Sequence, residues 1–416
     1  MGTFIFGGNC MDYHLLKEKY GTPLYVYDVD YMTNVMRLYK ENFKSDLFET
    51  EVIYASKAFC VKEMLRLVKR EGLSLDTVSL GELATAKVVD FDFSRVYFHG
   101  NNKSKAELIC AISTNVGNIV VDNLMELELL EELLKDYRKK VNILIRLNLG
   151  VEAHTHKFIV TAHVDSKFGV LYNSDDYLKM LEICKSSNKI NLIGFHSHIG
   201  SQIFDLEAFN QAIKKMVNIC KDFDYPLVLN LGGGFGVHYT DEDKPVPFNE
   251  VSRFLINCLE TAIKENNVCL KKVCIEPGRS IVAEAGSTLY TIGFTKQTPN
   301  KLYYFIDGGM TDNIRPALYQ AMYSADIVGK ENEIKKNVVS IAGKCCESGD
   351  VIIENILLPE AKTGDLLVTY STGAYGYSMS SNYNKALTPA VVFVENGVDR
   401  LAVERQTLEQ LMMREI

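Results

Sequence analysis

The sequence lacks the features that mark several large classes of protein. It contains no dense run of lysine and arginine, and its formal net charge is −8, whereas nucleic-acid-binding proteins usually show a basic patch or a basic balance. Residues Met1–Asp12 have neither the basic segment nor the long apolar segment of a secretory signal. No apolar stretch approaches the length of a membrane span. We therefore expect a cytoplasmic protein that binds neither nucleic acid nor membranes.

The ten cysteines have no regular spacing, so they do not outline a disulfide framework. Cys345 and Cys346 are adjacent, and neighbours this close rarely form a disulfide. We interpret the cysteines as reduced thiols. What the chain does have is 416 residues, of which 47% are hydrophobic. That is enough for a large core and for two or three domains.

A short apolar, β-branched run followed by a helical pattern recurs along the chain up to Arg279. The stretches Leu124–Lys140 and Leu206–Phe223 have apolar residues at the spacing of an amphipathic helix. This alternation predicts parallel β-α units, and eight of them over this length predict a TIM barrel rather than an open sheet. The predicted strands are Val52–Ser56, Ser74–Ser79, Arg95–His99, Asn118–Asp122, Asn142–Asn148, Leu192–His198, Leu227–Leu231 and Val273–Glu276.

After Arg279 the pattern changes to short strands separated by turns, which predicts a second, mostly β domain of sandwich or barrel type. Thr3–Phe6 is a candidate for one more strand of that domain. We therefore expect a barrel over residues 28–283 and a β domain formed by residues 1–27 and 284–416. The predicted strands are Thr288–Phe294, Lys301–Asp307, Val338–Ile341, Asp350–Leu357, Leu366–Thr369 and Ala390–Glu395.

In a TIM barrel the active site lies at the C-terminal ends of the strands. Lys57 comes directly after the first predicted strand. A lysine next to a buried strand is costly unless it is paired or used, and desolvation lowers its pKa and prepares it to form a Schiff base. Considered alone, however, Lys57 is more simply a surface lysine whose apolar stem lies along the strand end.

Two more polar groups follow predicted strands seven and eight. Gly232–Gly236 offers bare backbone N–H groups, and loops at this place in TIM barrels often bind phosphate, although a flexible turn has the same composition. Glu276 and Arg279 end strand eight. A carboxylate here can keep a pyridine nitrogen protonated, and an arginine can bind a carboxylate or a phosphate. The alternative is a structural ion pair.

His196 and His198 lie two residues apart near the end of predicted strand six and should point to the same side. Such a pair can bind a metal ion, but no third or fourth ligand stands at a suggestive spacing. We therefore expect no metal site. A ring that stacks on a flat cofactor suits one of these histidines better.

The second domain contributes further candidates. Cys346 stands beside Glu347 and could donate a proton, or it could be an inert buried cysteine. Arg315 and Tyr319 share one face if Ile314–Ala325 is helical, where they could bind a carboxylate or form a solvated surface. Tyr375 lies in a glycine-flanked loop, and the alternative for it is a core tyrosine.

Together and in this order, the motifs resemble those of the fold-type III decarboxylases that depend on pyridoxal phosphate (PLP), most closely the branch that acts on meso-diaminopimelate. The resemblance covers the chain from Thr22 to about Asn384. It rests on Tyr54-Ala55-Ser56-Lys57, His196-x-His198-Ile199-Gly200-Ser201-Gln202, Gly232-Gly233-Gly234, Glu276-Pro277-Gly278-Arg279, Cys346-Glu347-Ser348-Gly349-Asp350 and Gly373-Ala374-Tyr375.

The resemblance implies roles for these residues. Lys57 would hold PLP as a Schiff base, His198 would stack on its ring, and Glu276 would pair with the pyridine nitrogen. The phosphate would be held by a second group, which comprises Ser201, Gly233, Gly234, Gly278, Arg279 and the nearby Tyr375. The substrate would be bound by a third group, which comprises Arg279, Arg315, Tyr319, Glu347 and Tyr375.

The resemblance also implies a reaction and an assembly. The α-carboxylate would be lost from meso-diaminopimelate, Cys346 would protonate the same carbon, and lysine would be released. In this family the cysteine and its neighbouring acid come from the partner subunit, which implies a homodimer. Glu347 and the two arginines favour this substrate, because the similar ornithine and arginine enzymes usually show Cys-Asp and their substrates lack a second carboxylate.

Three alternatives stay open beside this interpretation. The first is a decarboxylase of ornithine, arginine or a carboxylated polyamine. The second is a non-catalytic PLP-binding homologue, and the third is an alanine racemase. The sequence departs from the family pattern at Ala162, at Lys344 and at Lys385–Leu387, which affects our expectations for loop details and not for the reaction.

Overall fold

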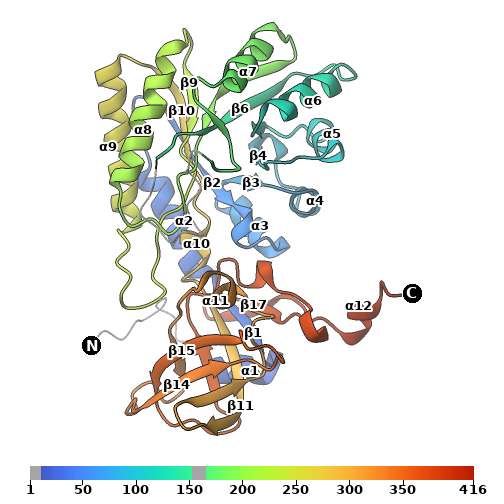
Figure 1. Ribbon diagram of the computed structural model, residues 1–416, viewed down its shortest axis with the longest axis vertical. Helices are drawn as coiled ribbons and strands as arrows, with labels where there is room; N and C mark the ends of the chain where they lie inside the picture. Colours follow the sequence, from blue (N-terminus) through green and yellow to red (C-terminus); the bar gives the residue numbers. More distant parts are fainter. Residues whose placement is uncertain (1–10, 152–164) are drawn as a thin grey trace. The chain divides into compact units, whose positions relative to one another are not determined.

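The computed structural model describes residues 11–151 and 165–416, and the chain divides into two compact units. The barrel unit comprises Val35–Gly236 and Pro245–Gly278, and the β unit comprises Met1–Asn34, Val237–Lys244 and Arg279–Ile416. Figure 1 follows both units along the chain. The segment Val237–Lys244 lies inside the range predicted for the barrel but belongs to the β unit. The predicted strand Thr3–Phe6 and the departure at Ala162 lie outside the described residues.

The barrel unit is a closed, parallel, eight-stranded barrel, as predicted. Its strands follow the order β5-β4-β3-β2-β10-β9-β8-β6, and pairing of β5 with β6 closes the ring. The short β7, Val170–Leu171, pairs with the end of β6. The strands are β2 (Glu49–Ala55), β3 (Ser74–Thr77), β4 (Val96–Phe98), β5 (Asn118–Val121), β6 (Val141–Asn148), β8 (Ile190–His196), β9 (Leu227–Asn230) and β10 (Leu270–Ile275).

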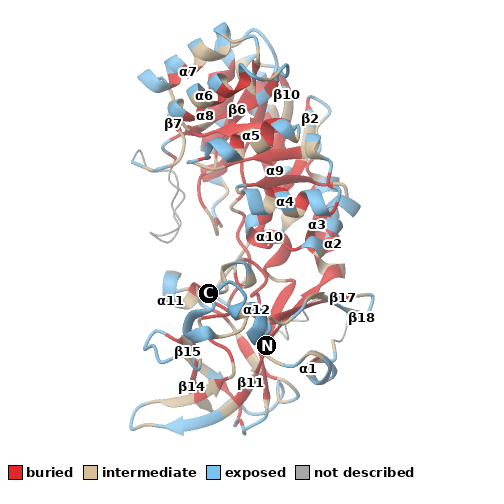
Figure 2. Cartoon of the chain, turned by 90° about the vertical axis from the view of Figure 1, so that its right-hand side faces the viewer, coloured by how far each residue is buried: buried red, intermediate tan, exposed pale blue. Residues whose placement is uncertain are grey.

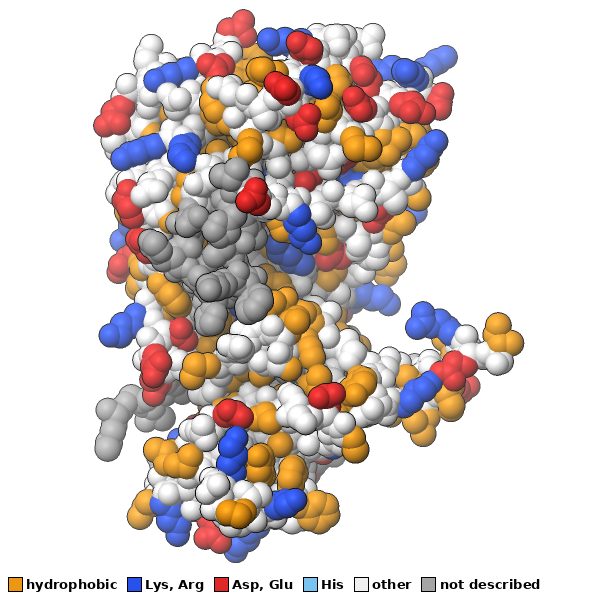
Figure 3. All heavy atoms as spheres, viewed as in Figure 1, with side chains coloured by type: hydrophobic (Ala, Val, Ile, Leu, Met, Phe, Trp, Pro, Cys, Tyr) orange, Lys and Arg blue, Asp and Glu red, His pale blue; other side chains and the backbone are white. Residues whose placement is uncertain are grey.

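One helix precedes the first barrel strand, and further helices connect successive strands. Figure 2 shows exposed outer faces on helices such as α7, whereas β6 and β10 are mostly buried, and Figure 3 shows acidic and basic side chains spread over the face that it views. Side-chain caps set several helix starts; the Ser104 hydroxyl, for example, accepts from the N–H of Glu107 in a capping box. The helices are α2 (Val29–Asn42), α3 (Lys62–Arg70), α4 (Leu80–Val88), α5 (Lys105–Ser113), α6 (Leu124–Leu134), α7 (Asp175–Ser186), α8 (Glu207–Ile219) and α9 (Phe248–Asn266).

The predicted helix Leu124–Lys140 is too long, because α6 ends at Leu134. The N–H groups of Asp136 and Tyr137 bond to carbonyls only three residues back, so the chain tightens into turns there. The physical reason is that residues 135–140 offer almost no apolar side chain to bury, whereas α6 itself buries a leucine-rich face.

Side chains fill the barrel interior, so the barrel is a core rather than a pore. One buried cluster draws a residue from each of six strands, and each fully buried apolar side chain contributes about 1.5–3 kcal/mol. Its members are Ile53, Tyr97, Val120, Leu144, Val228 and Cys274. With the interior filled, the open end of the barrel is the place where polar side chains can gather.

The β unit is built on a nine-stranded sheet with the order β15-β14-β12-β11-β1-β17-β18, in which β16 pairs with β11 and β13. All six strands predicted after Arg279 are present. Three of the strands that the structure describes were not predicted, namely β1, β13 and β18. The strands are β1 (Leu24–Asp28), β11 (Gly286–Gln297), β12 (Leu302–Ile306), β13 (Ala325–Ile327), β14 (Asn337–Ala342), β15 (Val351–Leu358), β16 (Leu366–Thr369), β17 (Ala390–Glu395) and β18 (Val398–Val403).

Short helices complete the β unit: α1 (Tyr13–Tyr20), α10 (Arg279–Val282), α11 (Arg315–Tyr319) and α12 (Leu408–Met412). The predicted helix Ile314–Ala325 is wrong beyond Tyr319, because Gln320 adopts a left-handed conformation with φ of 55° and β13 begins at Ala325. Among the helices of residues 11–151 and 165–416, none carries an apolar run that would reach across a bilayer. Every cysteine that the structure describes is a free thiol.

Candidate active site

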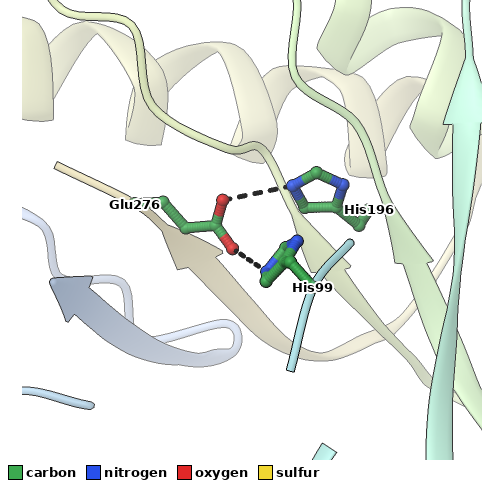
Figure 4. Close-up of side chains that lie close together, drawn as sticks. All are labelled: His99, His196 and Glu276. Carbon is green, nitrogen blue, oxygen red and sulfur yellow. Dashed lines mark hydrogen bonds and ion pairs between the residues drawn. The ribbon is translucent and has the colours of Figure 1, made fainter. Parts of the chain in front are cut away.

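At the C-terminal end of the barrel strands, a buried carboxylate lies between two imidazoles. Glu276 directly follows β10 and is 7% exposed. Its Oε1 accepts from Nδ2 of Asn230 at 2.7 Å and lies 2.9 Å from Nε2 of His99. Its Oε2 lies 3.1 Å from Nε2 of His196 (Figure 4). Four strands, β4, β8, β9 and β10, therefore position one carboxylate.

The charges in this group are ordered by burial and by proximity. Burial by itself would raise the pKa of Glu276, but His99 and His196 outweigh it and hold that pKa well below its usual 4.5. Burial also acts against protonation of His99, yet Asp76 and Glu276 raise its pKa above 6.5. For His196 burial prevails, and its pKa falls to about 4. Glu276 is thus ionised, with a neutral His196 on one side.

His99, His196 and Glu276 also bring their ligand atoms within 4.8 Å of one another, an arrangement that could hold a metal ion. The argument from sequence spacing found only His196 and His198, because His99 and Glu276 come from distant strands. In the structure, however, Nε2 of His196 forms a hydrogen bond with Oε2 of Glu276, and Nε2 of His99 lies at ion-pair distance from Oε1. Each carboxylate oxygen therefore already faces one imidazole. The absence of a metal stays a prediction.

Lys57 lies in the short 3₁₀ turn Ser56–Ala58 that follows β2, at the same end of the barrel. Its charge acts on the side chains of Asp76, Glu82 and His198. Lys57 itself is exposed in this chain, whereas its neighbours Ser56 and Ala58 are buried.

His198 lies just beyond β8, and its Nδ1 accepts a hydrogen bond from the N–H of Gly233 at 3.2 Å. Burial, reinforced by the charge of Lys57, lowers the pKa of His198 well below 6.5, so the ring is neutral. His196 and His198 are thus separated by role: the first faces Glu276, and the second faces the glycine turn.

The glycine turn is packed too closely for any other residue. A Cβ on Gly233 would lie 2.1 Å from the carbonyl oxygen of Glu276, and one on Gly234 would lie 2.1 Å from that of Gly200, next to Ser201. A Cβ on Gly278 would lie 2.9 Å from Cβ of Ala55. The predicted phosphate-binding residues of the barrel unit therefore surround backbone that only glycine can form.

In the β unit, two buried arginines share a set of tyrosines. Arg279 and Arg315 are 8% and 5% exposed. Arg279 donates to the hydroxyl of Tyr239, and Arg315 donates to that of Tyr323. The Cζ of Arg279 also lies 4.9 Å from the ring centre of Tyr375. The fold thus brings together three of the residues predicted to bind substrate.

Tyr319 stays a predicted partner of Arg315 in substrate binding. It ends α11 in a half-buried position, and among the described residues it makes no hydrogen bond with Arg315. The hydroxyl of Tyr323 and the ring of Tyr239 contact Arg315. The helix α11 is five residues long, with Arg315 buried at its first position and Tyr319 half-buried at its last.

Cys346 and Glu347 lie in the loop between β14 and β15, and both are exposed, so the alternative of an inert buried cysteine is wrong. The buried Asp350 holds this loop. Its Oδ1 accepts from the N–H of Met310 at 2.6 Å, and its Oδ2 accepts from that of Cys345 at 2.8 Å. The loop that carries the predicted proton donor is therefore tied to its own unit through one carboxylate.

The sequence reasoning missed four polar residues of the barrel end: Asp76, His99, Arg146 and Asn230. Each lies near the C-terminal end of a predicted strand, so a check of the last residues of every strand would have found them. Arg146, for instance, has its guanidinium 3.8 Å from Asp122 and 4.5 Å from the ring centre of Phe168. Tyr239 had no such signal.

Comparisons with known proteins agree with this geometry. A model of the family "Pyridoxal-dependent decarboxylase, pyridoxal binding domain" matches residues 32–283. Diaminopimelate decarboxylase from Bacillus methanolicus is 48% identical over 94% of this chain and 92% of its own length. The enzyme of the same name from Bacillus subtilis strain 168 is 47% identical over 99% of this chain and 94% of its own.

Solved structures give the same picture. Diaminopimelate decarboxylase from Helicobacter pylori, complexed with L-lysine, superposes with a TM-score of 0.89 at 32% identity, covering 97% of this chain and 99% of that one. A lysine/ornithine decarboxylase from Vibrio vulnificus, complexed with putrescine, gives 0.75 at 23% identity, covering 92% and 98% of the two chains, and so shares the fold.

Proposed function

This chain belongs to the family of pyridoxal-dependent decarboxylases, and we propose that it uses PLP to convert meso-2,6-diaminopimelate into L-lysine and carbon dioxide, the last step of lysine biosynthesis. The observation that carries the choice of substrate is the pair of buried arginines, Arg279 and Arg315. Ornithine and arginine offer no second carboxylate to such a pair, whereas meso-diaminopimelate keeps one after the other has been lost.

The residues of the barrel end fit the cofactor. A carboxylate has about four acceptor positions. Asn230 and His196 each form a hydrogen bond with Glu276, and His99 lies at ion-pair distance from Oε1, which leaves a position on Oε2 for a protonated ring nitrogen. The glycine backbone at Gly233 and Gly234, with Ser201, suits a phosphate group. The ring of His198 is neutral and anchored, so it suits stacking on a flat ring.

PLP, when it is bound, supplies a conjugated ring that accepts the electrons left by the departing carboxylate. The chain does the rest. Lys57 would hold the cofactor covalently through its side-chain amine. Glu276 keeps the ring nitrogen protonated, and Arg279 and Arg315 bind the distal carboxylate together with Tyr319 and Tyr375. Orientation of the bond to be broken follows from binding both ends of the substrate.

The proton and the amino group involve the loop between β14 and β15. Cys346 delivers a proton to the carbon that has lost its carboxylate, and Glu347 binds the amino group of the substrate. Both side chains are exposed. We further propose that they serve the barrel of a second copy of this chain, which makes the enzyme a homodimer, and that it works in the cytoplasm, where free cysteines persist.

Carbon dioxide release tests the reaction. The wild-type protein should release it from meso-diaminopimelate only when PLP is supplied, and ornithine and arginine should give little. Lys57→Ala should lose the absorption band of covalently bound cofactor together with the activity, while Lys62→Ala, on the surface of α3, should keep both. A PLP-loaded protein that releases no carbon dioxide from meso-diaminopimelate would exclude the proposed substrate.

Subunit mixing tests the shared site. Lys57→Ala and Cys346→Ala would each be inactive alone. If the two residues come from different copies, mixing the variants should restore roughly a quarter of the wild-type activity, since half of the dimers are mixed and each has one intact site. No recovery after proven subunit exchange would place both residues in one copy.

A further inference from the structure

Tyr239 is the side chain on which the two arginines of the β unit converge. It lies in the segment Val237–Lys244, which follows β9 in the chain but packs with the β unit. Its N–H donates to Oδ2 of Asp243 at 2.9 Å, and its carbonyl accepts from the hydroxyl of Ser324 at 3.2 Å. The side chain is 7% exposed, so neighbouring atoms restrict its position on nearly every side.

One phenol contacts both guanidinium groups, and its ring centre lies 5.7 Å from Cζ of Arg279. The hydroxyl of Tyr239 accepts a hydrogen bond from Nη1 of Arg279. Its ring centre lies 4.9 Å from Cζ of Arg315, within the range of a cation–π contact. Tyr323 completes the group, because its hydroxyl accepts from Arg315 and its ring meets that of Tyr239 edge-on, with centres 5.4 Å apart.

This arrangement stabilises two positive charges, those of Arg279 and Arg315, that are both buried. Among the residues that the structure describes, no carboxylate forms an ion pair with Arg315, and a buried charge without an opposite partner is costly. Burial acts to raise the pKa of Tyr239, yet Arg279 and Arg315 bring that pKa below its ordinary 10. The phenol therefore carries part of the compensation that an anionic ligand would complete.

We propose that Tyr239 is a positioning residue that spaces Arg279 and Arg315 for the distal carboxylate and so makes the site specific for ligands that carry one. This rests on the proposed function, which assigns that carboxylate to the two arginines. The hydroxyl and the ring of Tyr239 each act on both guanidinium groups, and together they fix the spacing of the two arginines. Loss of the hydroxyl should loosen the arginines in part, and loss of the ring as well should loosen them further.

Direct binding to the PLP-loaded enzyme tests the proposal without relying on turnover. L-lysine keeps the distal carboxylate, and 1,5-diaminopentane is the same molecule without it. By calorimetry, Tyr239→Phe should raise the Kd of lysine about tenfold, and Tyr239→Leu should raise it about a hundredfold, as expected for the loss first of the hydroxyl contacts and then of the ring contacts as well. The Kd of diaminopentane should not change.

Tyr290→Phe is the matched control, because its hydroxyl is buried in the same unit without a hydrogen-bond partner among the described residues. It should leave both dissociation constants unchanged. Equal weakening of lysine and diaminopentane in the Tyr239 variants, or no weakening of lysine, would overturn the proposal. A wild-type protein that shows the expected lysine binding but releases no carbon dioxide would contradict the proposed function and would not contradict the role of Tyr239.

Discussion

Nε2 of His99 lies 2.9 Å from Oε1 of Glu276, although the two residues come from strands β4 and β10 and stand far apart in the sequence. The contact places a readily protonated imidazole against a buried carboxylate. Burial raises the pKa of Glu276, and His99 is the largest of the influences that lower it well below its usual value. The protonation state of the carboxylate proposed to hold the cofactor's ring nitrogen therefore depends on a residue that has no motif of its own.

His99→Gln should make the acidic limb of the activity profile move to higher pH. Glutamine can still donate a hydrogen bond, but it lacks the positive charge that lowers the pKa of Glu276. As the pH falls, Glu276 should then be protonated earlier, and kcat should fall with it. The measurement is kcat against pH at saturating PLP, with a loss of about tenfold at the acid end. The exposed His14→Gln is the control, and an unmoved limb in His99→Gln would contradict the idea.

His196 should make the barrel unit sensitive to acid. In the folded chain its pKa falls from 6.5 to about 4, so between these values the unfolded chain binds a proton that the folded chain does not. The free energy of unfolding should therefore decrease as the pH falls through this window, by at most about 3 kcal/mol. The raised pKa of His99 acts in the opposite direction, because its stabilisation is lost as the pH rises.

The comparison of His196→Gln with wild type separates these two contributions. Urea unfolding at several pH values should show a smaller decline below pH 6.5 in the variant, since the variant has lost only the group that gains a proton on unfolding. Parallel curves for the two proteins would show that His196 is not responsible.

Asp350→Asn should loosen the loop that carries Cys346. The two oxygens of Asp350 accept from backbone N–H groups of Met310 and Cys345, and the amide of asparagine would turn a donor toward one of them. Each hydrogen bond to a charged group contributes about 1.5–3 kcal/mol, so kcat should fall at least tenfold. The rate at which iodoacetamide labels Cys346, followed by mass spectrometry, should change as well.

The control for this loop is Glu354→Gln, on β15, whose carboxylate is more than half exposed and pairs with Lys301. It should leave both the labelling rate and kcat unaltered. Should Asp350→Asn label at the wild-type rate, the loop would not depend on this carboxylate.

A buried ion pair, Lys103 with Glu126, should behave differently from an exposed one. Nζ of Lys103 lies 2.6 Å from Oε1 of Glu126 and also donates to two carbonyls, and both side chains are nearly inaccessible. Lys103→Met leaves the carboxylate buried without its cation, so the free energy of unfolding should fall by about 3–5 kcal/mol.

The double variant Lys103→Met with Glu126→Leu should recover part of that loss, because no uncompensated charge stays buried. Lys385→Met breaks the exposed pair with Glu415 and should leave the stability nearly unchanged. Additive effects of the two buried substitutions in denaturant unfolding would argue against a coupled pair.

Much of the fold was predictable from the sequence. Each barrel strand has its own apolar run, and the pattern that defines it spans only a few neighbouring residues. The candidate site residues that directly follow a strand could be found for the same reason, because the preceding strand fixes their place. They are Lys57, Glu276 and the glycine turn. The predictions failed where a local pattern was extended too far, as in Leu124–Lys140, or where a helix proved too short, as at Arg315–Tyr319.

The sequence by itself determined that a parallel barrel is followed by a β unit, and it placed Lys57 at a strand end beside the motifs of a cofactor site. Only the tertiary structure decided that Lys57 is exposed, that Glu276 lies between His99 and His196, and that Tyr239 contacts two arginines of the β unit. The physical reason is the separation along the chain of the residues that determine each feature. Strands and turns depend on neighbours along the chain, whereas these contacts depend on the order and register in which distant strands close a sheet.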